Sequence, residues 1–343
     1  MPSRAIPGRP GQLLARVKEH TIGRHSVLAA AVGALLLAAC KSDGGTAPPA
    51  PNSWVQKASS PGGPVLGAVS FVVNDKLYVG TGLRNNYTNS FSEYDPGRNT
   101  WTAVASLPSD VRLNAIGFAI GNYGYVGLGS NCLGSGVCTF QYFSDLWRYD
   151  PRSNSCARMA DFPGTARALA ATFVIGDNAY VTGGSYAGDN DLWEYNPTAN
   201  SWTRKADYPG GCTARQTAFS VAGKGYLGLG YSDGPCDDFW RYDPSANSST
   251  ATAIFPGPAR YDALGFSLGN TSFVVGGGTV LTDVWAYNPS NDSWAKLDTA
   301  YPGKGRSQMI AGIASGRIFL GLGTNSDAGA PVGDDLWEYI PAQ

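Results

Sequence analysis

A phrase of twelve residues recurs along this chain and constrains its fold more than any other feature. Its fullest copy reads Asp191-Leu-Trp-Glu-Tyr-Asn-Pro-Thr-Ala-Asn-Ser-Trp202. The residues before Asn-Pro predict one strand and those after it predict a second, joined by a turn in which the fixed φ of proline is favourable. Weaker or shorter copies begin at Ser90, Asp145, Asp238, Asp283 and Asp335. The chain is therefore a repeat protein.

The spacing of the phrase predicts a ring of similar units. Its tyrosines lie 55, 46, 47, 45 and 52 residues apart. A period near 50 residues is typical of β-propellers, in which each repeat forms a blade of four antiparallel strands. Abundant glycine and a charged fraction of only 15% also favour short strands and tight turns. The tyrosines are Tyr94, Tyr149, Tyr195, Tyr242, Tyr287 and Tyr339. The sequence predicts an all-β, six-bladed propeller.

The third unit shows the expected blade. Leu169–Ile175 is predicted as the inner strand and Ala179–Gly183 as the second, joined by a tight hairpin at Gly176-Asp-Asn178. Leu192–Tyr195 and Ser201–Lys205 are predicted as the third and fourth strands.

The two ends of the repeat region are complementary. Unit six stops at Ile340-Pro341, before a fourth strand, whereas the region begins with Asn52-Ser-Trp54, which matches Asn200-Ser-Trp202. We expect the N-terminal segment to complete the last blade, because pairing the ends removes the open edge of a ring. The propeller is assigned to residues 53–341.

Glycine and aromatic marks of this period resemble kelch repeats, across 53–341. The Gly183-Gly184 doublet and the triplet Gly276–Gly278 follow the kelch pattern, while other units have Gly-x-Gly. No helix signal follows these glycines, so they do not indicate a dinucleotide site. In fold and length the chain is similar to bacterial sialic-acid epimerases, and more distantly to the kelch domain of galactose oxidase. The copper site of galactose oxidase needs histidines that the propeller lacks.

The N-terminus has the pattern of an export signal. Basic residues precede an apolar run from Val27 to Ala39, which is too short to span a bilayer. The run ends in Leu37-Ala-Ala-Cys40, which resembles the lipobox of bacterial lipoproteins; that resemblance implies that Cys40 is lipidated. The alternative is an ordinary signal peptide. Residues 1–39 are thus expected to be a signal peptide and 40–52 a flexible tether. The protein is expected in the bacterial cell envelope, anchored by lipid to the outer membrane, facing the periplasm or the surface.

Charge and histidine content exclude several functions. Without residues 1–39 the chain has 20 basic and 25 acidic residues, a net charge of about −5, and no basic run. Nucleic-acid binding is therefore not expected. Both histidines, His20 and His25, lie in the leader. Sites with His-ligated metal and nucleophile–histidine pairs are excluded for the rest of the chain, and no cofactor or metal is expected.

Five cysteines remain after Cys40. Export permits disulfides, and we predict two loop staples, Cys132–Cys138 and Cys212–Cys236. Cys156 stands where other copies of the phrase have tryptophan, so it is predicted to be a buried free thiol; a redox role is the alternative.

An arginine precedes the inner strand of five units. By topology these arginines lie where the loops between second and third strands emerge, and a ring of guanidinium groups is suited to binding a carboxylate or sulfate. The alternative is that each arginine pairs with an aspartate of the phrase in its own or the next blade; unit one lacks both, having Val65 and Ser90. The arginines are Arg112, Arg167, Arg215, Arg260 and Arg306.

The loops between second and third strands vary most, and variable loops on a rigid scaffold are typical recognition sites. Their aromatics are candidates for stacking on sugars or a protein, or for packing the loops. The candidate contacts are Tyr87, Tyr142, Tyr186, Tyr231 and Tyr261, with Phe140 and Phe143 nearby. Aspartates 233, 237, 327 and 334 lack the spacing of a calcium loop.

Three functions remain compatible with these features. The first is a lipid-anchored binding module that recognises a glycan or an envelope protein through this loop face. The second is a sugar-acting enzyme, as the resemblance to sialic-acid epimerases implies, using carboxylates and arginines at the channel mouth. The third is a structural element of an envelope assembly.

Overall fold

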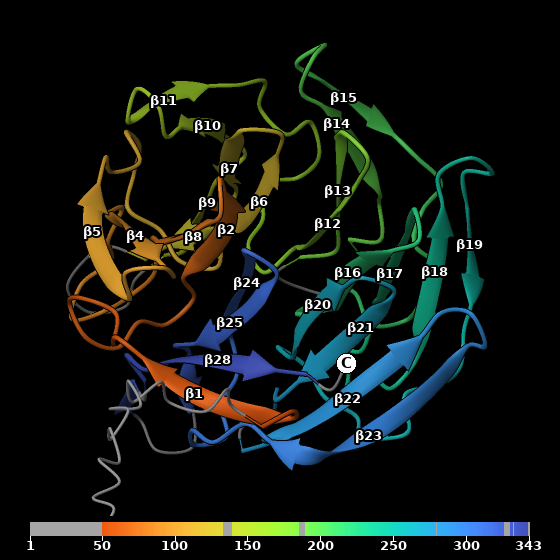
Figure 1. Ribbon diagram of the computed structural model, residues 1–343. Coiled ribbons are helices and arrows are strands. Elements are labelled where there is room, and N and C mark those ends of the chain that lie inside the picture. Colours follow the sequence, from red (N-terminus) through yellow and green to blue (C-terminus); the bar gives the residue numbers. More distant parts are fainter. Residues whose placement is uncertain are drawn as a thin grey trace, which may run out of the picture. The chain divides into compact units, whose positions relative to one another are not determined.

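The computed structural model describes residues 50–132, 139–184, 189–278, 280–325, 330–331 and 333–341. These residues form six antiparallel sheets of four strands, arranged as blades around a central axis (Figure 1). No helix occurs among them, and so none is long and apolar enough to cross a membrane. The predicted all-β, six-bladed propeller is confirmed.

Each blade runs from an inner strand to an outer one in sequence order, except for the last. Blade 1 contains β2 (Val69–Val73), β3 (Lys76–Gly80), β4 (Phe91–Asp95) and β5 (Thr100–Val104). Blade 2 contains β6 (Ile116–Ile120), β7 (Tyr123–Gly127), β10 (Leu146–Asp150) and β11 (Ser155–Arg158). Blade 3 contains β12 (Ala171–Ile175), β13 (Asn178–Thr182), β14 (Trp193–Asn196) and β15 (Ser201–Arg204), close to the ranges predicted from sequence.

The second half of the ring repeats this order. Blade 4 contains β16 (Thr217–Val221), β17 (Lys224–Gly228), β18 (Phe239–Asp243) and β19 (Ser248–Ala251). Blade 5 contains β20 (Leu264–Leu268), β21 (Thr271–Val275), β22 (Asp283–Asn288) and β23 (Ser293–Ala300). Blade 6 contains β24 (Ile310–Ala314), β25 (Arg317–Gly321), β28 (Leu336–Ile340) and β1 (Ser53–Lys57). Two short pairs lie in loops: β8 (Ser130–Asn131) with β9 (Gln141–Tyr142), and β26 (Thr324–Asn325) with β27 (Ala330–Pro331).

The ring is closed by its two ends, as the sequence predicts. Strand β1 pairs antiparallel with β28, and Trp54 lies opposite Tyr339 in that register (Figure 1). The Tyr339 hydroxyl donates a hydrogen bond of 3.0 Å to the side-chain oxygen of Asn52. The last blade therefore has its outer strand supplied by the N-terminal segment.

The repeated phrase holds neighbouring blades together. In blade 3 the Tyr195 hydroxyl donates to Oδ1 of Asn200 at 2.9 Å, and the same oxygen accepts the backbone N–H of Ala160 from the preceding connection at 2.9 Å. The Trp202 indole N–H donates to the Ala160 carbonyl at 3.0 Å. Because a buried polar group must be paired, these positions of the phrase are fixed by structure. The tyrosine–asparagine or tyrosine–aspartate contact recurs at Tyr94, Tyr149, Tyr242 and Tyr287.

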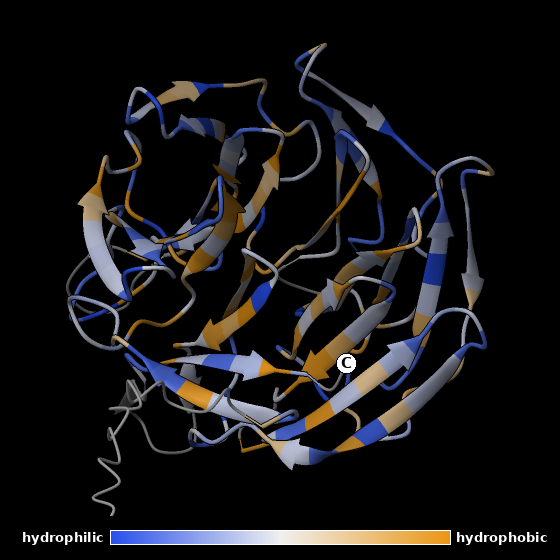
Figure 2. Ribbon diagram, in the orientation of Figure 1, coloured by the Kyte–Doolittle hydropathy of each residue, from blue (hydrophilic) through white to orange (hydrophobic). Residues whose placement is uncertain are grey.

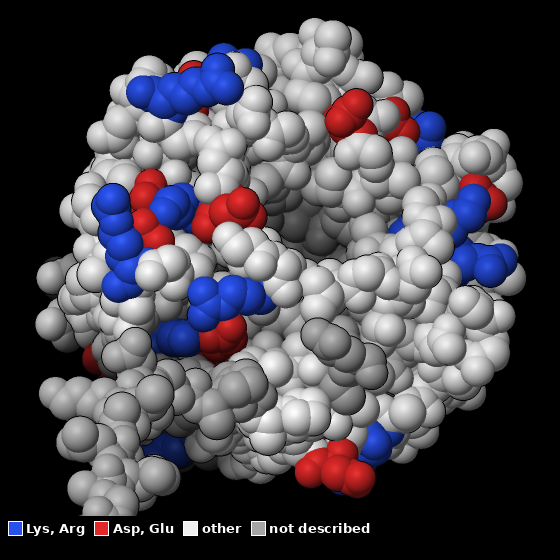
Figure 3. All heavy atoms as spheres, viewed as in Figure 1, with Lys and Arg blue, Asp and Glu red and all other residues white. Residues whose placement is uncertain are grey.

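Hydrophobic residues gather on the inner strands and the outer strands are more polar (Figure 2). Side chains alternate between a buried face and a partly exposed one, as in β2 and β6. Aromatic rings fill the space between blades: Phe173 stacks on Tyr180 at 5.2 Å and meets Tyr242 of the next blade. Gly225 makes room for this packing, since a Cβ there would lie 2.1 Å from Cε2 of Phe173. The six inner strands line a central channel of about 570 Å³. Figure 3 shows one face of the ring, hollowed at its centre, with charges scattered in mixed clusters.

Candidate functional site

Four of the five predicted arginines form buried ion pairs. Arg112 is completely buried, and its Nη1 and Nη2 lie 2.5 and 2.8 Å from Oδ1 and Oδ2 of Asp145. Its Nη1 also donates to the Leu128 carbonyl, and its guanidinium lies 4.2 Å from the centre of the Phe143 ring. The same two-point pairing joins Arg167 to Asp191, Arg260 to Asp283, and Arg306 to Asp335.

The guanidinium groups of these four arginines are therefore engaged within the protein. A guanidinium removed from water is stable only when it is paired and hydrogen-bonded, and the aspartates of the phrase supply that pairing. Of the two interpretations that the sequence left open, the ion-pair interpretation holds for Arg112, Arg167, Arg260 and Arg306, all at most 3% exposed in their side chains.

Arg215 does not belong to this set, and its alignment with the other four is wrong by two residues. The carbonyl of each buried arginine accepts a backbone N–H from a glycine of the preceding blade; Gly129, for example, donates to Arg167 at 2.8 Å. In blade 4 the corresponding donor, Gly184, binds the carbonyl of Thr213 at 2.9 Å. Thr213 therefore occupies the arginine position of that blade.

Arg215 belongs to a second ring, in which each residue has left-handed backbone geometry. Successive members are joined by backbone hydrogen bonds: Asn114 donates to the Gly67 carbonyl, Leu169 to Asn114, and Asp262 to Arg215. A left-handed φ is costly outside glycine and asparagine, and such residues concentrate at functional sites. The six members are Gly67, Asn114, Leu169, Arg215, Asp262 and Gln308, with φ between 53° and 62°.

Arg215 and Asp262 form a polar centre in this ring. Nη1 of Arg215 lies 2.8 Å from Oδ2 of Asp262, and the Arg215 side chain is 39% exposed. Gln308 donates from Nε2 to the same Oδ2 at 3.3 Å. Burial raises the pKa of Asp262; the charge of Arg215 and the hydrogen bond from Gln308 offset only part of that rise. The site thus combines a half-exposed cation with a buried carboxyl that holds a proton more readily than usual.

Two aromatic pairs flank a cavity beside this centre. Tyr231 and Tyr261 meet edge to face with centroids 5.4 Å apart, and Phe140 lies 6.2 Å from Tyr142. Arg215 lies over the Tyr261 ring at 5.5 Å. The cavity has a volume of about 660 Å³ and is lined by Asn114, Ser130, Phe140, Tyr142, Ala168, Leu169, Ala214, Arg215, Tyr231, Ser232 and Tyr261. We call it the mouth cavity. Phe140 is 50% exposed and Tyr231 42%, so large aromatic faces are available to a ligand.

The structure thus brings four of the predicted candidates, Tyr142, Arg215, Tyr231 and Tyr261, to the lining of one cavity. Tyr87 does not line the mouth cavity; it pairs with Leu83 within the loop of blade 1. Tyr186 lies outside the described residues. Sequence reasoning missed Asn114 and Ser232, which carry no motif. Within the described ranges no group of three or more Cys, His, Asp or Glu side chains could hold a metal.

The predicted Cys212–Cys236 disulfide is present, with Cα atoms 6.3 Å apart. It fixes the loop that carries Tyr231, because the Cys236 N–H also donates to the Gly230 carbonyl. The predicted Cys132–Cys138 pair cannot be followed in the structure, because Cys138 lies outside the described residues. Cys40 and the leader lie outside them as well. Cys156 is free and half-buried, and burial raises the pKa of its thiol to about 11.

Comparisons with known proteins agree with this architecture. The Kelch motif matches residues 64–108 and 166–207, which contain blades 1 and 3. No curated protein matches the sequence. Among solved structures, that of YjhT is similar, with a TM-score of 0.69 and 20% identity, over 81% of this chain and 95% of that chain. At this identity the likeness concerns the fold. The chain therefore carries Kelch motifs in a six-bladed β-propeller.

Proposed function

We propose that this protein is a lipid-anchored module of the bacterial envelope that binds a glycan in the mouth cavity. The observation that carries the proposal is the pairing of exposed aromatics with one accessible guanidinium. Phe140 and Tyr231 are the most exposed aromatics of the cavity, and they come from different blades. Aromatic faces provide apolar area at low entropic cost, and a few polar groups fix the orientation of a ligand.

The polar groups favour an acidic sugar. Arg215 uses Nη1 to bind Asp262, and a guanidinium has five N–H donors. The remaining donors are suited to a carboxylate, which arginine binds through two parallel hydrogen bonds. Asn114 and Ser232 line the same cavity and supply neutral donors and acceptors for sugar hydroxyls. A protein partner is the second binding class, and it would use the same exposed aromatics.

One observation favours an enzyme as the alternative function. Asp262 is buried beside Arg215, and burial raises its pKa, as it does for carboxyl groups that act as general acids or bases in enzymes. Interconversion of sugar anomers requires proton transfer to and from ring and anomeric oxygens. The resemblance to sialic-acid epimerases implies such a reaction, and Asp262 and Arg215 are the groups that would serve it.

An array of immobilised glycans tests the binding proposal. We expect the purified protein to retain acidic glycans, and Arg215→Ala to lose at least about tenfold in affinity, the effect of one charged hydrogen bond. Arg98→Ala is the matched control, because Arg98 is exposed on a turn between third and fourth strands, at the other face. Retention that is equal for all three proteins would contradict the assignment of the site.

The same proteins separate binding from catalysis. Anomer exchange of sialic acid is followed by NMR with and without the protein. Exchange at the uncatalysed rate supports a binding module. Exchange accelerated by the protein and lost in Asp262→Asn would establish the enzyme instead.

Anchorage is tested on Cys40. We propose that this residue carries the lipid, on the basis of the Leu37-Ala-Ala-Cys40 sequence. Metabolic labelling with an alkyne fatty acid is expected to mark the wild-type protein and not Cys40→Ala. Equal labelling of the two would show that the anchor lies elsewhere, and absence of label from both would show an ordinary secreted protein.

A further inference from the structure

Each buried arginine is held by three groups, which we call the arginine nest: an aspartate of the phrase, a backbone carbonyl and an aromatic ring. In blade 5, Nη1 of Arg260 lies 2.6 Å from Oδ1 of Asp283 and 2.9 Å from the Gly276 carbonyl. Its guanidinium lies 4.8 Å from the centre of the Phe255 ring. Carboxylate, carbonyl and aromatic face all attract a cation.

Blade 4 keeps the nest but has no arginine in it. Asp238 occupies the aspartate position, and Leu229 supplies the corresponding carbonyl. Tyr208-Pro-Gly210 corresponds to Phe255-Pro-Gly257, so the aromatic face is also retained. Thr213 stands in the arginine position, as the hydrogen bond from Gly184 shows. The nearest arginine in sequence, Arg215, is engaged with Asp262 and Tyr261.

One carboxylate oxygen of this nest lacks a partner among the described residues. Oδ2 of Asp238 accepts the Trp240 indole N–H at 2.8 Å, but Oδ1 is buried and receives no hydrogen bond. Tyr208 is only 2% exposed, and its hydroxyl lies beside the Gln216 side chain. Burial raises the pKa of Tyr208, the negative charge of Asp238 raises it further, and a hydrogen bond with the Gln216 side chain offsets part of the rise.

Asp238 is partly exposed, but a carboxylate oxygen that is buried with neither a hydrogen bond nor a counter-ion is costly. The same aspartate position is neutralised by an arginine in four other blades. Blade 1 has no such arginine, but it has Ser90 there and so carries no carboxylate to neutralise. Blade 4 alone, within the described residues, retains the negative charge without a side-chain cation.

We propose that a small monovalent cation binds in the nest of blade 4, between Oδ1 of Asp238, the Leu229 carbonyl and Tyr208. The single carboxylate balances one positive charge, which is the charge that arginine contributes in the other nests. A calcium ion requires six to eight oxygen ligands and usually several carboxylates. Burial of Tyr208 restricts access to small ions. Potassium and sodium would be ligated by oxygen atoms, whereas ammonium and guanidinium would donate N–H groups to the same acceptors.

The site stands independently of the proposed glycan function, but it adjoins the mouth cavity. Thr213 is followed directly by Ala214 and Arg215, which line that cavity, and is preceded by the disulfide-bonded Cys212. A cation in the nest would therefore stabilise the segment that carries Arg215.

Thermal unfolding of the full chain tests the proposal. The salts compared are potassium, sodium, ammonium and low concentrations of guanidinium chloride, each against tetramethylammonium chloride at equal ionic strength. We expect at least one small cation to raise Tm by about 2 °C or more at saturating concentration, by mass action on the folded state. The salt that produces the shift distinguishes an oxygen-ligated metal ion from an N–H donor.

Three variants assign the shift to this site. Asp238→Asn removes the charge and is expected to abolish the shift, whereas Asp237→Asn, at the exposed neighbouring residue, is expected to retain it. Thr213→Arg supplies the missing guanidinium and is expected to raise Tm in tetramethylammonium chloride and to remove the cation dependence. No specific shift in the wild type, or a shift that persists in Asp238→Asn, would overturn the proposal, and this holds even if Thr213→Arg does not fold.

Discussion

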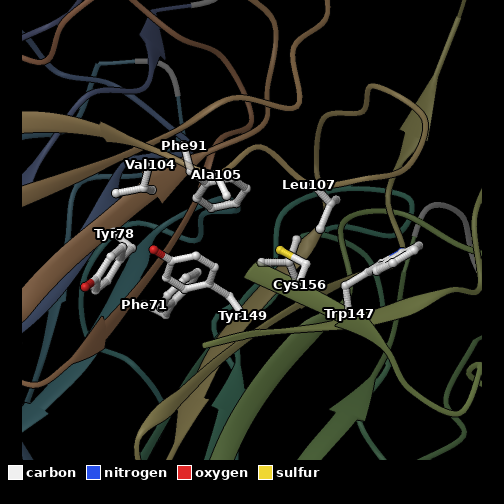
Figure 4. A pocket seen from close by; sticks show the side chains of 10 residues that line it. Phe71, Tyr78, Phe91, Val104, Ala105, Leu107, Trp147, Tyr149 and Cys156 are labelled. Atoms are coloured by element: carbon white, nitrogen blue, oxygen red, sulfur yellow. The ribbon is translucent and has the colours of Figure 1, made fainter. Parts of the chain in front are cut away.

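At the scale of single residues, Cys156 shows the effect of exchanging one position of the repeated phrase while the others are kept. Cys156 stands where blades 1, 3 and 5 have tryptophan, whose indole N–H donates to an alanine carbonyl of the preceding connection. In Figure 4, Cys156 lies between Leu107, Tyr149 and Trp147, at the edge of a small apolar pocket. Its raised pKa keeps the thiol protonated at neutral pH, so the site is suited to packing and not to thiolate chemistry.

Restoring the tryptophan of the phrase is expected to stabilise the protein. Ala105 lines the pocket, and its N–H already binds Asn154 at 2.8 Å, as the equivalent alanines do in other blades. In Cys156→Trp the indole ring would fill the pocket, and its N–H would donate to the Ala105 carbonyl. We expect these contacts to raise the free energy of unfolding by about 1 kcal/mol. Urea denaturation measures the change. The reverse exchange in blade 3, Trp202→Cys, should cost about 3 kcal/mol; a loss in both variants would show that blade 2 has repacked around cysteine.

At the scale of the elements, the buried ion pairs join the segment entering each inner strand to the third strand of the same blade. Arg260 and Asp283 come from these two places in blade 5, 23 residues apart. The pairing explains why the phrase opens with aspartate. It was predictable as one of two alternatives, because unit 1 lacks both the arginine and the aspartate. The position of Arg215 was not predictable, because Thr213 carries no sequence signal and only the backbone hydrogen bonds reveal the two-residue offset.

Removing one partner of such a pair should be far more damaging than removing both. Arg260→Met leaves the Asp283 carboxylate buried and unpaired and is expected to cost about 3–5 kcal/mol, while the double variant Arg260→Met, Asp283→Leu should recover much of that loss. The measurement compares the denaturant midpoints of the wild type, the single variant and the double variant. Arg158→Ala is the control, because Arg158 pairs with Asp161 at the exposed surface, where solvent screens the pair, and its loss is expected to change stability little. Equal losses in the single and double variants would contradict the argument.

The same pairs set the acid sensitivity of the fold. Burial alone would raise the pKa of Asp145, Asp191 and Asp283, but the hydrogen bonds and charge of their arginines outweigh it and lower each pKa. A carboxyl group whose pKa is lower in the folded state than in the unfolded state stabilises the fold at pH values above its unfolded pKa, which is about 4. This stabilisation is lost as the pH falls toward the folded pKa. The Tm should therefore be nearly constant from pH 7 to about 5 and fall steeply below about 4. A Tm that rises on acidification would contradict the stabilising role of these ion pairs.

For the whole molecule, the ring and its closure could be read from the sequence, and the mouth cavity could not. Five near-equal spacings and the match between Trp54 and Trp202 define the blades and the pairing of the ends. The cavity depends on which loops the ring brings together. Phe140 and Tyr142 come from the loop of blade 2, and Tyr231 from that of blade 4, so no local pattern connects them.

The central claim is that this cavity is where a ligand binds, and a crystal structure of the protein soaked in sialic acid tests it most directly. We predict density for the sugar between Tyr231 and Phe140, with its carboxylate within hydrogen-bond distance of the Arg215 guanidinium. Sugar density in the central channel, between outer strands or on the opposite face would contradict the account. The absence of sugar density from the mouth cavity at a saturating concentration would contradict it as well.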